Sequence, residues 1–510
     1  MVSLSRSEKK QLLAKEPLFD DFTCGLRAMG AQPKGIIKEC REVMAIGRKF
    51  AQEVVMPNVR ELDLKMTEDH DFLPMDFVKK ANQWGLYTMF IPKIFGGRGY
   101  NFSAFGYFME EIASVCLSMG NLVGVHYLGV SMLVSSWNIR LMNKILREVV
   151  EGEKTGKPCL MTLAMTEPDA GTDSQNTEFM NTGNLQCHAK KVDGGYVVNG
   201  TKIFISCGHL STWHMVHVYT DIDRAADNTV MLAVKTGAKG FSFGKTENKM
   251  GQKGSIASEL IFNNCFVPDD QVCIDNRQMT GLKRSYKETN AQIFAYIWGA
   301  SRVGVGYFGT ATARGAYEHA LRFASEQIVD GKRLINHEWC QGMLAQMYTN
   351  VAVSRVSCLE GFQANAMHGL WKLMNLKIIY YMVKYTPAIV LDKIFIWLSE
   401  KPFLTWVFRK ICFDFQKDEE INRVDGWGSL IKVAGTDAAV KNCQMALEIM
   451  GQAGIRHDRG AEKIFRDSKL LQIYEGTNQL NRLNVFKRLI SKSVNNAEVF
   501  PHPMFRRENE

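Results

Sequence analysis

The spacing of apolar residues changes twice along this chain, and those changes restrict its possible folds more than any other feature. Up to about residue 157 apolar side chains recur every three or four residues, as in Ile36–Val55 and Phe105–Leu117, which predicts helices. From Pro158 to about Pro268 they alternate instead, which predicts strands. From about residue 283 the helical spacing returns. Separate helical, strand and helical blocks predict an α+β fold and not a doubly wound sheet.

These blocks also give the expected domains. We expect an N-terminal helical domain over residues 1–157, a small β domain over 158–282 and a C-terminal helical domain over 283–510. Within the β block, Asn199-Gly200 stands between two apolar runs, Tyr196–Val198 and Lys202–Ile205. An Asn-Gly pair in that setting predicts a hairpin turn. Ile293–Ala324 predicts one or two long helices.

Charge and hydropathy exclude some classes of function. The formal net charge is +9, which is modest for 510 residues and forms no long basic run. We therefore expect no nucleic-acid partner, although the charge suits an acidic ligand such as the phosphates of CoA, or an anionic membrane surface. A membrane-spanning helix needs about 20 apolar residues, and we expect no uncharged segment of that length.

The cysteines and the start of the chain predict the compartment. Twelve cysteines are scattered without a CxxC pair or a framework spacing. In a chain of this length they indicate reduced thiols of a cytoplasmic protein. Met1–Glu16 mixes lysines, arginine and glutamates and has no apolar core, so we expect no secretory signal there.

One carboxylate near the C-terminus has an unusual setting. The segment Gln472–Gln479 reads QIYEGTNQ, which sets Glu475 between an aromatic residue and a glycine. Thr477 predicts an N-cap, and the residues after it have helical spacing. A carboxylate on a turn at a helix start, with glycine allowing close approach, suits proton abstraction. Taken alone, a solvated or capping glutamate is the more common case.

A glycine motif in the C-terminal block invites a different interpretation. Gly304–Gly309 reads GVGYFG and matches the GxGxxG pattern of dinucleotide-binding folds. That function requires a preceding strand and a βαβ unit. Both flanks of this segment, Ala291–Arg302 and Thr310–Ala324, have helical spacing. The glycines therefore predict a close approach of two helices.

Three motifs in order resemble one family. Leu163–Asp173 reads LAMTEPDAGTD, Asn199–Gly208 reads NGTKIFISCG, and the Glu475 segment follows near the end. Together they resemble the acyl-CoA dehydrogenase family of flavoproteins, from about Lys38 to Arg488. The resemblance implies a small β-barrel-like middle domain, a C-terminal four-helix bundle and FAD as the cofactor.

The resemblance places part of the flavin site in the β domain. Thr166, Gly171 and Thr172 match the flavin loop of the family, and Phe204 and Ser206 match the strand that faces the flavin ring. The family usually has Trp and Thr at the last two positions. Ser206 keeps a hydroxyl that could hydrogen-bond flavin N5. The alternative is an ordinary hairpin with a serine on one face.

Three residues match family positions that contact the adenosine half of FAD: Thr477, Gln479 and His337. Two other positions near this half depart from the family. Gln327 stands where the family has an arginine that reaches the pyrophosphate from a neighbouring subunit. Glu448 replaces a glutamine in a nearby segment. Losing a cation and gaining a carboxylate near a pyrophosphate is unfavourable without compensation. Either the pyrophosphate is held differently, or the contact between subunits has changed.

The resemblance also implies a reaction. Glu475 would take the α-proton of an acyl-CoA thioester while flavin N5 takes a hydride from the β-carbon, giving a trans-2-enoyl-CoA. The Glu475 amide and a ribityl hydroxyl would hydrogen-bond the thioester oxygen. Arg302 matches the family's arginine beside the base, and its small, apolar neighbours favour burial against a carboxylate. Residues 293–301 contain no Asp or Glu, so Glu475 has no rival on that helix.

Residues 371–412 exceed the usual family pattern. Pro387 and Pro402 divide this insertion into three short predicted helices. Basic residues alternate there with the aromatic side chains Trp371, Tyr380, Tyr381, Tyr385, Phe395, Trp397, Phe403, Trp406 and Phe408. This composition suits helices that lie in a membrane interface. It equally suits packing on the chain's own bundle or on a second subunit.

The implied partners follow from the family. We expect an acyl-CoA substrate, an electron-transfer flavoprotein as acceptor, a role in fatty acid β-oxidation, and a homodimer or homotetramer. From the composition of residues 371–412, and not from the family, comes the hypothesis of a peripheral contact with the inner face of the cytoplasmic membrane. One alternative is a flavin oxidase or monooxygenase on the same fold, which an Asp base would favour. Another is a non-catalytic flavin-bearing scaffold or nucleic-acid binder. The retained Glu475 and the absence of a basic tail run count against it.

Overall fold

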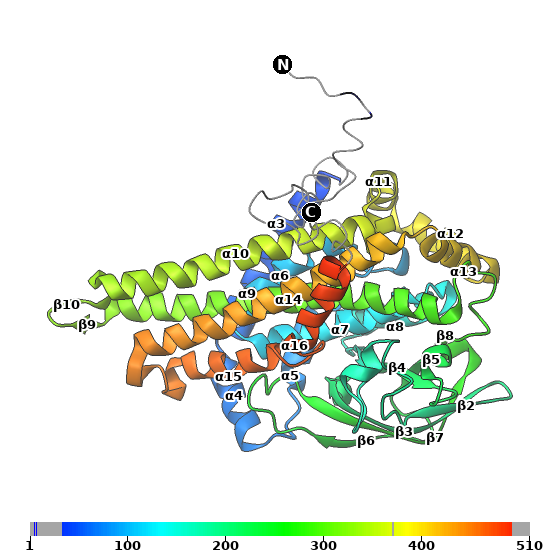
Figure 1. Ribbon diagram of the computed structural model, residues 1–510, viewed down its shortest axis with the longest axis horizontal. Helices are drawn as coiled ribbons and strands as arrows, with labels where there is room; N and C mark the ends of the chain where they lie inside the picture. Colours follow the sequence, from blue (N-terminus) through cyan, green and yellow to red (C-terminus); the bar gives the residue numbers. More distant parts are fainter. Residues whose placement is uncertain (1–4, 6, 8–32, 370–371, 492–510) are drawn as a thin grey trace, which may run out of the picture.

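The computed structural model describes Ser5, Ser7, residues 33–369 and residues 372–491. Several sequence predictions lie outside these residues: the missing signal at Met1–Glu16, Cys24, Trp371, and the ends of the two outer domains. Figure 1 shows a long helical bundle across the molecule, with a sheet beneath one end of it. Helices before and after the sheet confirm the predicted α+β architecture.

The N-terminal helices pack against both the bundle and the sheet. In chain order they are α3 (Gly35–Phe50), α4 (Val59–Glu68), α5 (Met75–Gln83), α6 (Phe105–Ala113), α7 (Leu117–Ser135) and α8 (Ile139–Thr155). Their apolar faces form one continuous core that includes Phe50, Phe108 and Leu146. The core extends into the bundle, so the helical blocks on either side of the sheet pack as one body.

Helix α7 contradicts the expectation that no uncharged segment is long enough to span a membrane. Its 19 residues include no Asp, Glu, Lys or Arg, and its most apolar 18-residue stretch has a mean hydropathy of 1.4. However, 89% of its most apolar stretch is buried within the protein. A Cβ at Gly129 would lie 2.7 Å from the backbone of Met161, so strand β1 passes directly over this helix. Helix α7 is apolar on all sides because other elements surround it.

The predicted reduced thiols agree with the structure. Every cysteine in the described part of the chain is free, and all of them except Cys40 are buried. Burial raises the pKa of the Cys207 thiol to about 11. These side chains therefore serve as small core residues.

The middle block folds into an eight-stranded sheet. Its strands are β1 (Met161–Ala164), β2 (His188–Val192), β3 (Gly195–Ser206), β4 (Trp213–Tyr219), β5 (Thr229–Lys235), β6 (Phe241–Thr246), β7 (Ala257–Pro268) and β8 (Val272–Ile274). The order is β6-β7-β3-β2-β4-β5-β8, and β1 pairs with β4 in parallel. This order places the ends of β1 and β3 beside each other at the bundle. Strand β3 carries the predicted flavin residues Phe204 and Ser206, and the loop after β1 carries Thr166, Gly171 and Thr172.

The predicted hairpin at Asn199-Gly200 is wrong. Strand β3 runs straight through this pair, and the turn lies earlier, at Asp193-Gly194 between β2 and β3. Instead, the register against β7 shifts between Val198 and Gly200, which marks a bulge. Gly200 has a φ of 126°, and a Cβ there would lie 2.7 Å from Cys187 Cα. Pairing with strands on both sides outweighed the local turn preference of Asn-Gly.

The C-terminal block confirms the predicted helical bundle. It contains α9 (Tyr286–Glu326), α10 (Glu338–His368), α14 (Asp418–Met450) and α15 (Ala461–Leu471), followed by the short α16 (Asn478–Val485). A small hairpin of β9 (Ile328–Val329) and β10 (Lys332–Arg333) joins α9 to α10. The hairpin lies at the end of the bundle opposite the sheet (Figure 1).

The GxGxxG segment lies inside α9, as its helical flanks predicted. A Cβ at Gly306 would lie 2.5 Å from Ile431 Cγ2, and one at Gly309 would lie 2.4 Å from the Gly435 carbonyl carbon. These two glycines let α9 and α14 approach closely. Gly304 has no neighbour within 4 Å of its Cβ position, because it faces a cavity.

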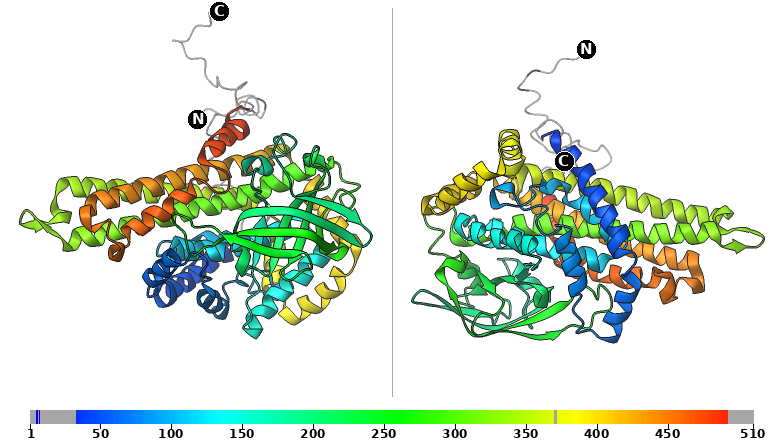
Figure 2. Two further views of the ribbon diagram at one scale, coloured as in Figure 1. Left: turned by 90° about the horizontal axis from the view of Figure 1, so that it is seen from below. Right: turned by 180° about the vertical axis from the view of Figure 1, so that it is seen from behind.

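The insertion forms the three predicted helices, α11 (Lys377–Tyr385), α12 (Ala388–Ser399) and α13 (Pro402–Arg409). Its inner side packs on its own chain, chiefly on the N-terminal helices (Figure 2). Phe408 stacks on Trp137 with ring centroids 5.6 Å apart, and the Arg409 guanidinium donates to the carbonyls of Ser136, Cys273 and Gln278 at 3.0 Å each. The outer side of α12 and α13 carries exposed apolar residues.

Candidate active site

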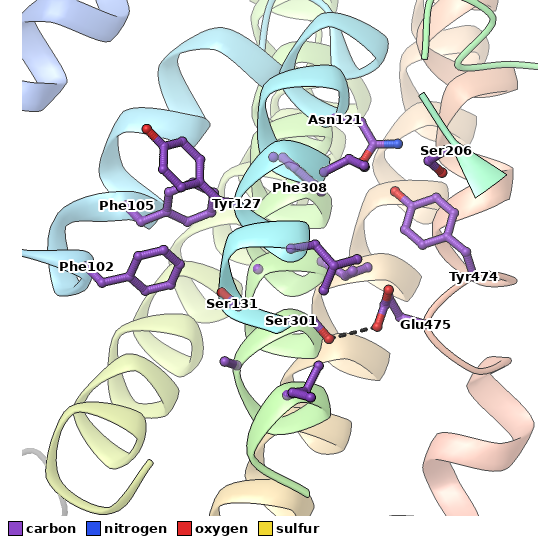
Figure 3. A pocket seen from close by; sticks show the side chains of 17 residues that line it. Phe102, Phe105, Asn121, Tyr127, Ser131, Ser206, Ser301, Phe308, Tyr474 and Glu475 are labelled. Carbon is purple, nitrogen blue, oxygen red and sulfur yellow. Dashed lines mark hydrogen bonds between the residues drawn. The ribbon is translucent and has the colours of Figure 1, made fainter. Parts of the chain in front are cut away.

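A mostly apolar cavity of about 100 Å³ lies where the bundle meets the sheet. One face of α7, one face of α9, the end of β3 and the turn at Tyr474-Glu475 enclose it. Figure 3 shows Glu475 and Tyr474 on one side of this cavity, with Phe102, Phe105 and Tyr127 on the opposite side. A carboxylate at the wall of an apolar cavity is an arrangement suited to proton abstraction from a bound apolar group.

The Glu475 turn has a strained backbone. Glu475 has a φ of 55°, a left-handed conformation that non-glycine residues rarely adopt, and Gly476 follows with a φ of 79°. The Thr477 side chain then accepts a hydrogen bond from Leu480 N at 3.3 Å, which confirms the predicted N-cap of α16. Strain of this kind persists where the surroundings hold it, and it is concentrated at functional sites.

The Glu475 carboxylate is held by α9. Ser301 Oγ donates to Glu475 Oε2 at 2.7 Å. Burial raises the pKa of Glu475, while the Ser301 hydrogen bond and the nearby Arg302 and Lys432 cations lower it. The net direction is upward, so this carboxylate is a stronger base than a solvated glutamate. Sequence reasoning missed the role of Ser301, because a lone serine in a helix carries no recognisable pattern.

Arg302 lies beside the Glu475 turn as predicted, but its guanidinium is buried against a different carboxylate. Arg302 Nη1 donates to Asp425 Oδ1 at 2.8 Å and to Ser429 Oγ at 3.0 Å. Its Nε donates to the Glu475 backbone carbonyl at 3.2 Å. Only 4% of Arg302 is exposed. Arg302 therefore holds the backbone of the base and makes no hydrogen bond to its carboxylate.

A buried lysine, which the sequence did not single out, supports the same turn. Lys432 Nζ donates to the Gly476 carbonyl at 2.8 Å and to Asn478 Oδ1 at 2.7 Å. Desolvation, reinforced by the Arg302 charge, lowers the pKa of Lys432 to about 7. With Arg302 it gives two cations that fix successive carbonyls of the strained turn. This explains how Glu475 is kept in its left-handed conformation.

The two motifs of the β domain meet at the edge of this cavity. Ile203 N donates to Thr166 O at 2.9 Å, which sets Thr166 beside Phe204, and Ser206 lines the cavity wall. Beneath them, Lys202 Nζ and Glu167 Oε1 form a fully buried ion pair of 2.7 Å. This pair fixes the loop after β1 against β3.

The residues at this edge fit a flavin. Phe204 has a φ of 56° and 55% of it is exposed, so the strand presents an aromatic face outward in a strained conformation. No atom lies within 4 Å of the Cβ position of Gly171, which leaves the loop open to close approach. Gln175 Oε1 is buried without a hydrogen-bond partner. Thr166, Thr172 and Ser206 are half-buried along the same edge and offer hydroxyl groups.

The residues expected at the adenosine half do not lie together within one chain. Thr477 caps α16, and Gln479 is exposed on that helix. His337 begins α10 near the β9–β10 hairpin, where its Nε2 lies 3.1 Å from Val329 O. The two departures, Gln327 and Glu448, are exposed in the same part of the bundle. Figure 1 places the β9–β10 hairpin at the end of the molecule opposite the sheet.

Comparisons with known proteins agree with this geometry. The chain matches the acyl-CoA dehydrogenase N-terminal domain over residues 38–153 and the middle domain over residues 162–265. It matches the C-terminal domain over residues 295–378 and 415–490. The interruption in the C-terminal match coincides with helices α11–α13.

The similar proteins belong to the same group. An acyl-CoA dehydrogenase of Bacillus subtilis is 25% identical over 447 residues, covering 87% of this chain and 96% of the relative. A cyclohex-1-ene-1-carbonyl-CoA dehydrogenase of Geobacter metallireducens is 26% identical over 459 residues, with coverages of 90% and 99%. The solved glutaryl-CoA dehydrogenase complex has the same fold, with a TM-score of 0.67, 18% identity and coverages of 91% and 97%. The chain thus belongs to the acyl-CoA dehydrogenase family and is an FAD-dependent oxidoreductase.

Proposed function

We propose that the protein converts an acyl-CoA thioester to the trans-2-enoyl-CoA, with Glu475 as the base that removes the α-proton. The observation that carries this proposal is the half-buried Glu475 carboxylate at the wall of an apolar cavity, with Ser206 at the end of β3 lining the same cavity. Bound FAD supplies the acceptor for the hydride that leaves the β-carbon. The chain's own residues bind the acyl group, exclude water and hold the base.

The Glu475 backbone gives the second part of the proposed chemistry. Among the described residues, none accepts a hydrogen bond from the Glu475 amide. The Arg302 and Lys432 contacts to the turn hold this amide in a fixed direction. A fixed N–H can donate to the thioester oxygen, where negative charge develops as the proton leaves. The same residue then supplies both the base and a donor.

The direct test is Glu475→Gln, which keeps the size and the Ser301 hydrogen bond but removes the basic oxygen. We expect acyl-CoA binding to persist, while anaerobic bleaching of the flavin by a panel of acyl-CoAs slows by at least ~10²–10⁴-fold. The matched control is Glu68→Gln, the same change at an exposed carboxylate on α4, away from the cavity. Bleaching at the wild-type rate in Glu475→Gln would remove Glu475 from its role.

Bleaching of the flavin by acyl-CoA, followed by its reoxidation, separates the dehydrogenase from the alternative functions. We propose an electron-transfer flavoprotein as the acceptor and fatty acid β-oxidation as the setting, as the family resemblance implies. The reduced enzyme should then react slowly with oxygen and fast with an electron-transfer flavoprotein. Fast reoxidation by oxygen would favour a flavin oxidase or monooxygenase. A flavin that no acyl-CoA bleaches would favour a non-catalytic scaffold.

We further propose that the active form is a homodimer or homotetramer. The support is the separation of the β9–β10 hairpin, which His337 contacts, from the sheet that carries Ser206 (Figure 1). A single FAD would need a second copy of the chain to meet both groups. Helix α10, which starts just after His337, also exposes Val353 and Val356, and such apolar residues suit a contact between copies.

The outer side of the insertion supports a peripheral contact with the inner face of the cytoplasmic membrane. Ile389, Trp397 and Phe403 on α12 and α13 are each more than 60% exposed. Lys393 is exposed on the same side of α12, and Lys401 Nζ lies 5.0 Å from the Trp397 ring centroid. Aromatic side chains interleaved with lysines match an interface of acyl chains and anionic headgroups. We therefore propose an anionic membrane surface as the partner of this face.

A further inference from the structure

The cavity beside Glu475 is the proposed site of the acyl group and is called the acyl cavity. A second cavity lies behind the wall of the acyl cavity that faces Glu475. It measures about 40 Å³ and has walls from both the N-terminal domain and the segment after α10. Its apolar lining includes Phe90, Pro92, Met374 and Val383. Of these, Val383 lies on α11, in the part of the chain that interrupts the family match.

Phe102 borders both cavities, since it lines the acyl cavity on one side and the second cavity on the other. Its ring stacks on Phe105 with centroids 4.9 Å apart, and Tyr127 lies 6.4 Å away. Figure 3 shows these three rings facing Glu475 across the acyl cavity. Only Phe102 of the three is shared with the second cavity.

Contacts from the insertion hold Phe102 in place. The neighbouring Asn101 donates through its backbone N to Glu39 Oε2 at 2.7 Å and through Nδ2 to Asn375 Oδ1 at 3.0 Å. The other oxygen of Glu39 accepts from Tyr380 OH at 2.6 Å and from Lys384 Nζ at 2.7 Å, both on α11. Glu39, Asn101 and Asn375 are all buried. The loop that carries Phe102 is therefore fixed to α11 by a network whose polar groups are paired with one another.

We propose that Phe102 is the specificity-determining partition that ends the acyl-binding site, and that the cavity lined by α11 can hold the distal carbons of a longer straight acyl chain only when the Phe102 ring is removed. The inference rests on the proposed acyl-CoA dehydrogenase function. With the ring in place, the acyl group ends at Phe102, and the enzyme favours shorter acyl chains. Removing the ring joins the two cavities and extends the site toward Met374 and Val383.

The test compares straight-chain acyl-CoAs from butanoyl to hexadecanoyl on wild type and Phe102→Ala. We expect the longest accepted chain to increase in Phe102→Ala, with kcat/KM for chains just beyond the wild-type limit rising at least about tenfold relative to shorter ones. Titration calorimetry of the same acyl-CoAs with Glu475→Gln forms of both proteins measures binding apart from turnover, and it should show the same change in chain length. Identical length profiles in wild type and Phe102→Ala would overturn the inference.

Two further variants make the test specific to the second cavity. Val383→Phe refills that cavity from the α11 side, so it should reverse the effect of Phe102→Ala in the double variant and leave the wild-type profile unchanged. Phe105→Ala enlarges the acyl cavity without opening the partition and should not lengthen the accepted chain. A double variant that still accepts longer chains, or an equal effect of Phe105→Ala, would show that the distal carbons lie elsewhere.

The outcomes also distinguish this inference from the proposed function. If no acyl-CoA bleaches the wild-type flavin, the proposed function fails. If wild type reacts but Phe102→Ala leaves the length profile unchanged, only the partition fails. Phe102→Leu, a smaller truncation, replaces Phe102→Ala if that variant does not fold, and it should give a smaller change in the same direction. No change in Phe102→Leu would equally overturn the inference.

Discussion

The Ser301 hydroxyl sets how far burial can raise the pKa of Glu475. Burial raises this pKa, and the largest opposing contribution is the hydrogen bond from Ser301. The ionised form of Glu475 is the one that can accept a proton. Activity should therefore fall as the pH drops through the raised pKa, above the ordinary range of a glutamate. Because the Ser301 hydrogen bond lowers the pKa of Glu475, activity begins to fall at a lower pH than it would without that hydrogen bond.

The substitution Ser301→Ala tests this balance. Because the hydroxyl stabilises the ionised carboxylate, its loss should raise the pKa of Glu475 further and move the acidic limb of the pH–rate profile to higher pH. Rapid-reaction measurements of flavin bleaching across pH would show the shift. Ser131→Ala is the matched control, since Ser131 lines the same cavity on α7. An acidic limb that stays in place, or moves to lower pH, would contradict the assigned role.

Among the site residues, sequence reasoning found those that belong to motifs. Glu475 and Ser206 line one cavity, and Thr166 contacts the strand that carries Ser206, so the motifs meet in space. Lys432 and Phe102 could not be found in the same way. Each acts through partners more than 40 positions away or on another domain, and a single residue of a common type shows no local pattern. Their roles depend on tertiary contacts alone.

At the level of elements, local signals succeeded where tertiary contacts agreed with them. Pro387 and Pro402 divided the insertion correctly, because proline removes a backbone donor whatever the surroundings. Asn199-Gly200 gave the wrong turn, because strands β2 and β7 flank β3 and hold the chain extended there. Helix α7 was not identified as a long apolar segment, and its apolarity is explained only by the elements that cover it.

The exposed side of α12 and α13 yields a prediction about membranes. Wild type should sediment with vesicles that contain anionic lipid and not with neutral phosphatidylcholine vesicles, and added salt should weaken the association. Replacing both Trp397 and Phe403 by serine should abolish it without changing acyl-CoA turnover in solution. Phe266→Ser changes an exposed aromatic residue of the β domain and serves as the control. Equal sedimentation of all three proteins would reject the membrane contact.

At the level of the whole molecule, the residues that the family resemblance assigns to the two halves of FAD lie apart within one chain. We therefore expect the FAD-loaded protein to be at least a dimer by light scattering after size-exclusion chromatography. Changing both Val353 and Val356 on α10 to aspartate should give monomers that lose FAD, because buried like charges oppose association. Ile222→Asp, at an exposed position outside the helical bundle, should leave both properties unchanged. An FAD-loaded wild-type monomer would contradict the assembly.

The ion pair between Glu167 and Lys202 limits which substitutions this protein can tolerate at either position. Both side chains are fully buried, so replacing either one alone leaves the other charged and unpaired, at a cost of about 3–5 kcal/mol. A lineage can therefore change these positions only together, and the loop after β1 and strand β3 must be inherited as a linked pair. Anyone who grafts the strand from a relative into this scaffold would have to transplant the loop with it.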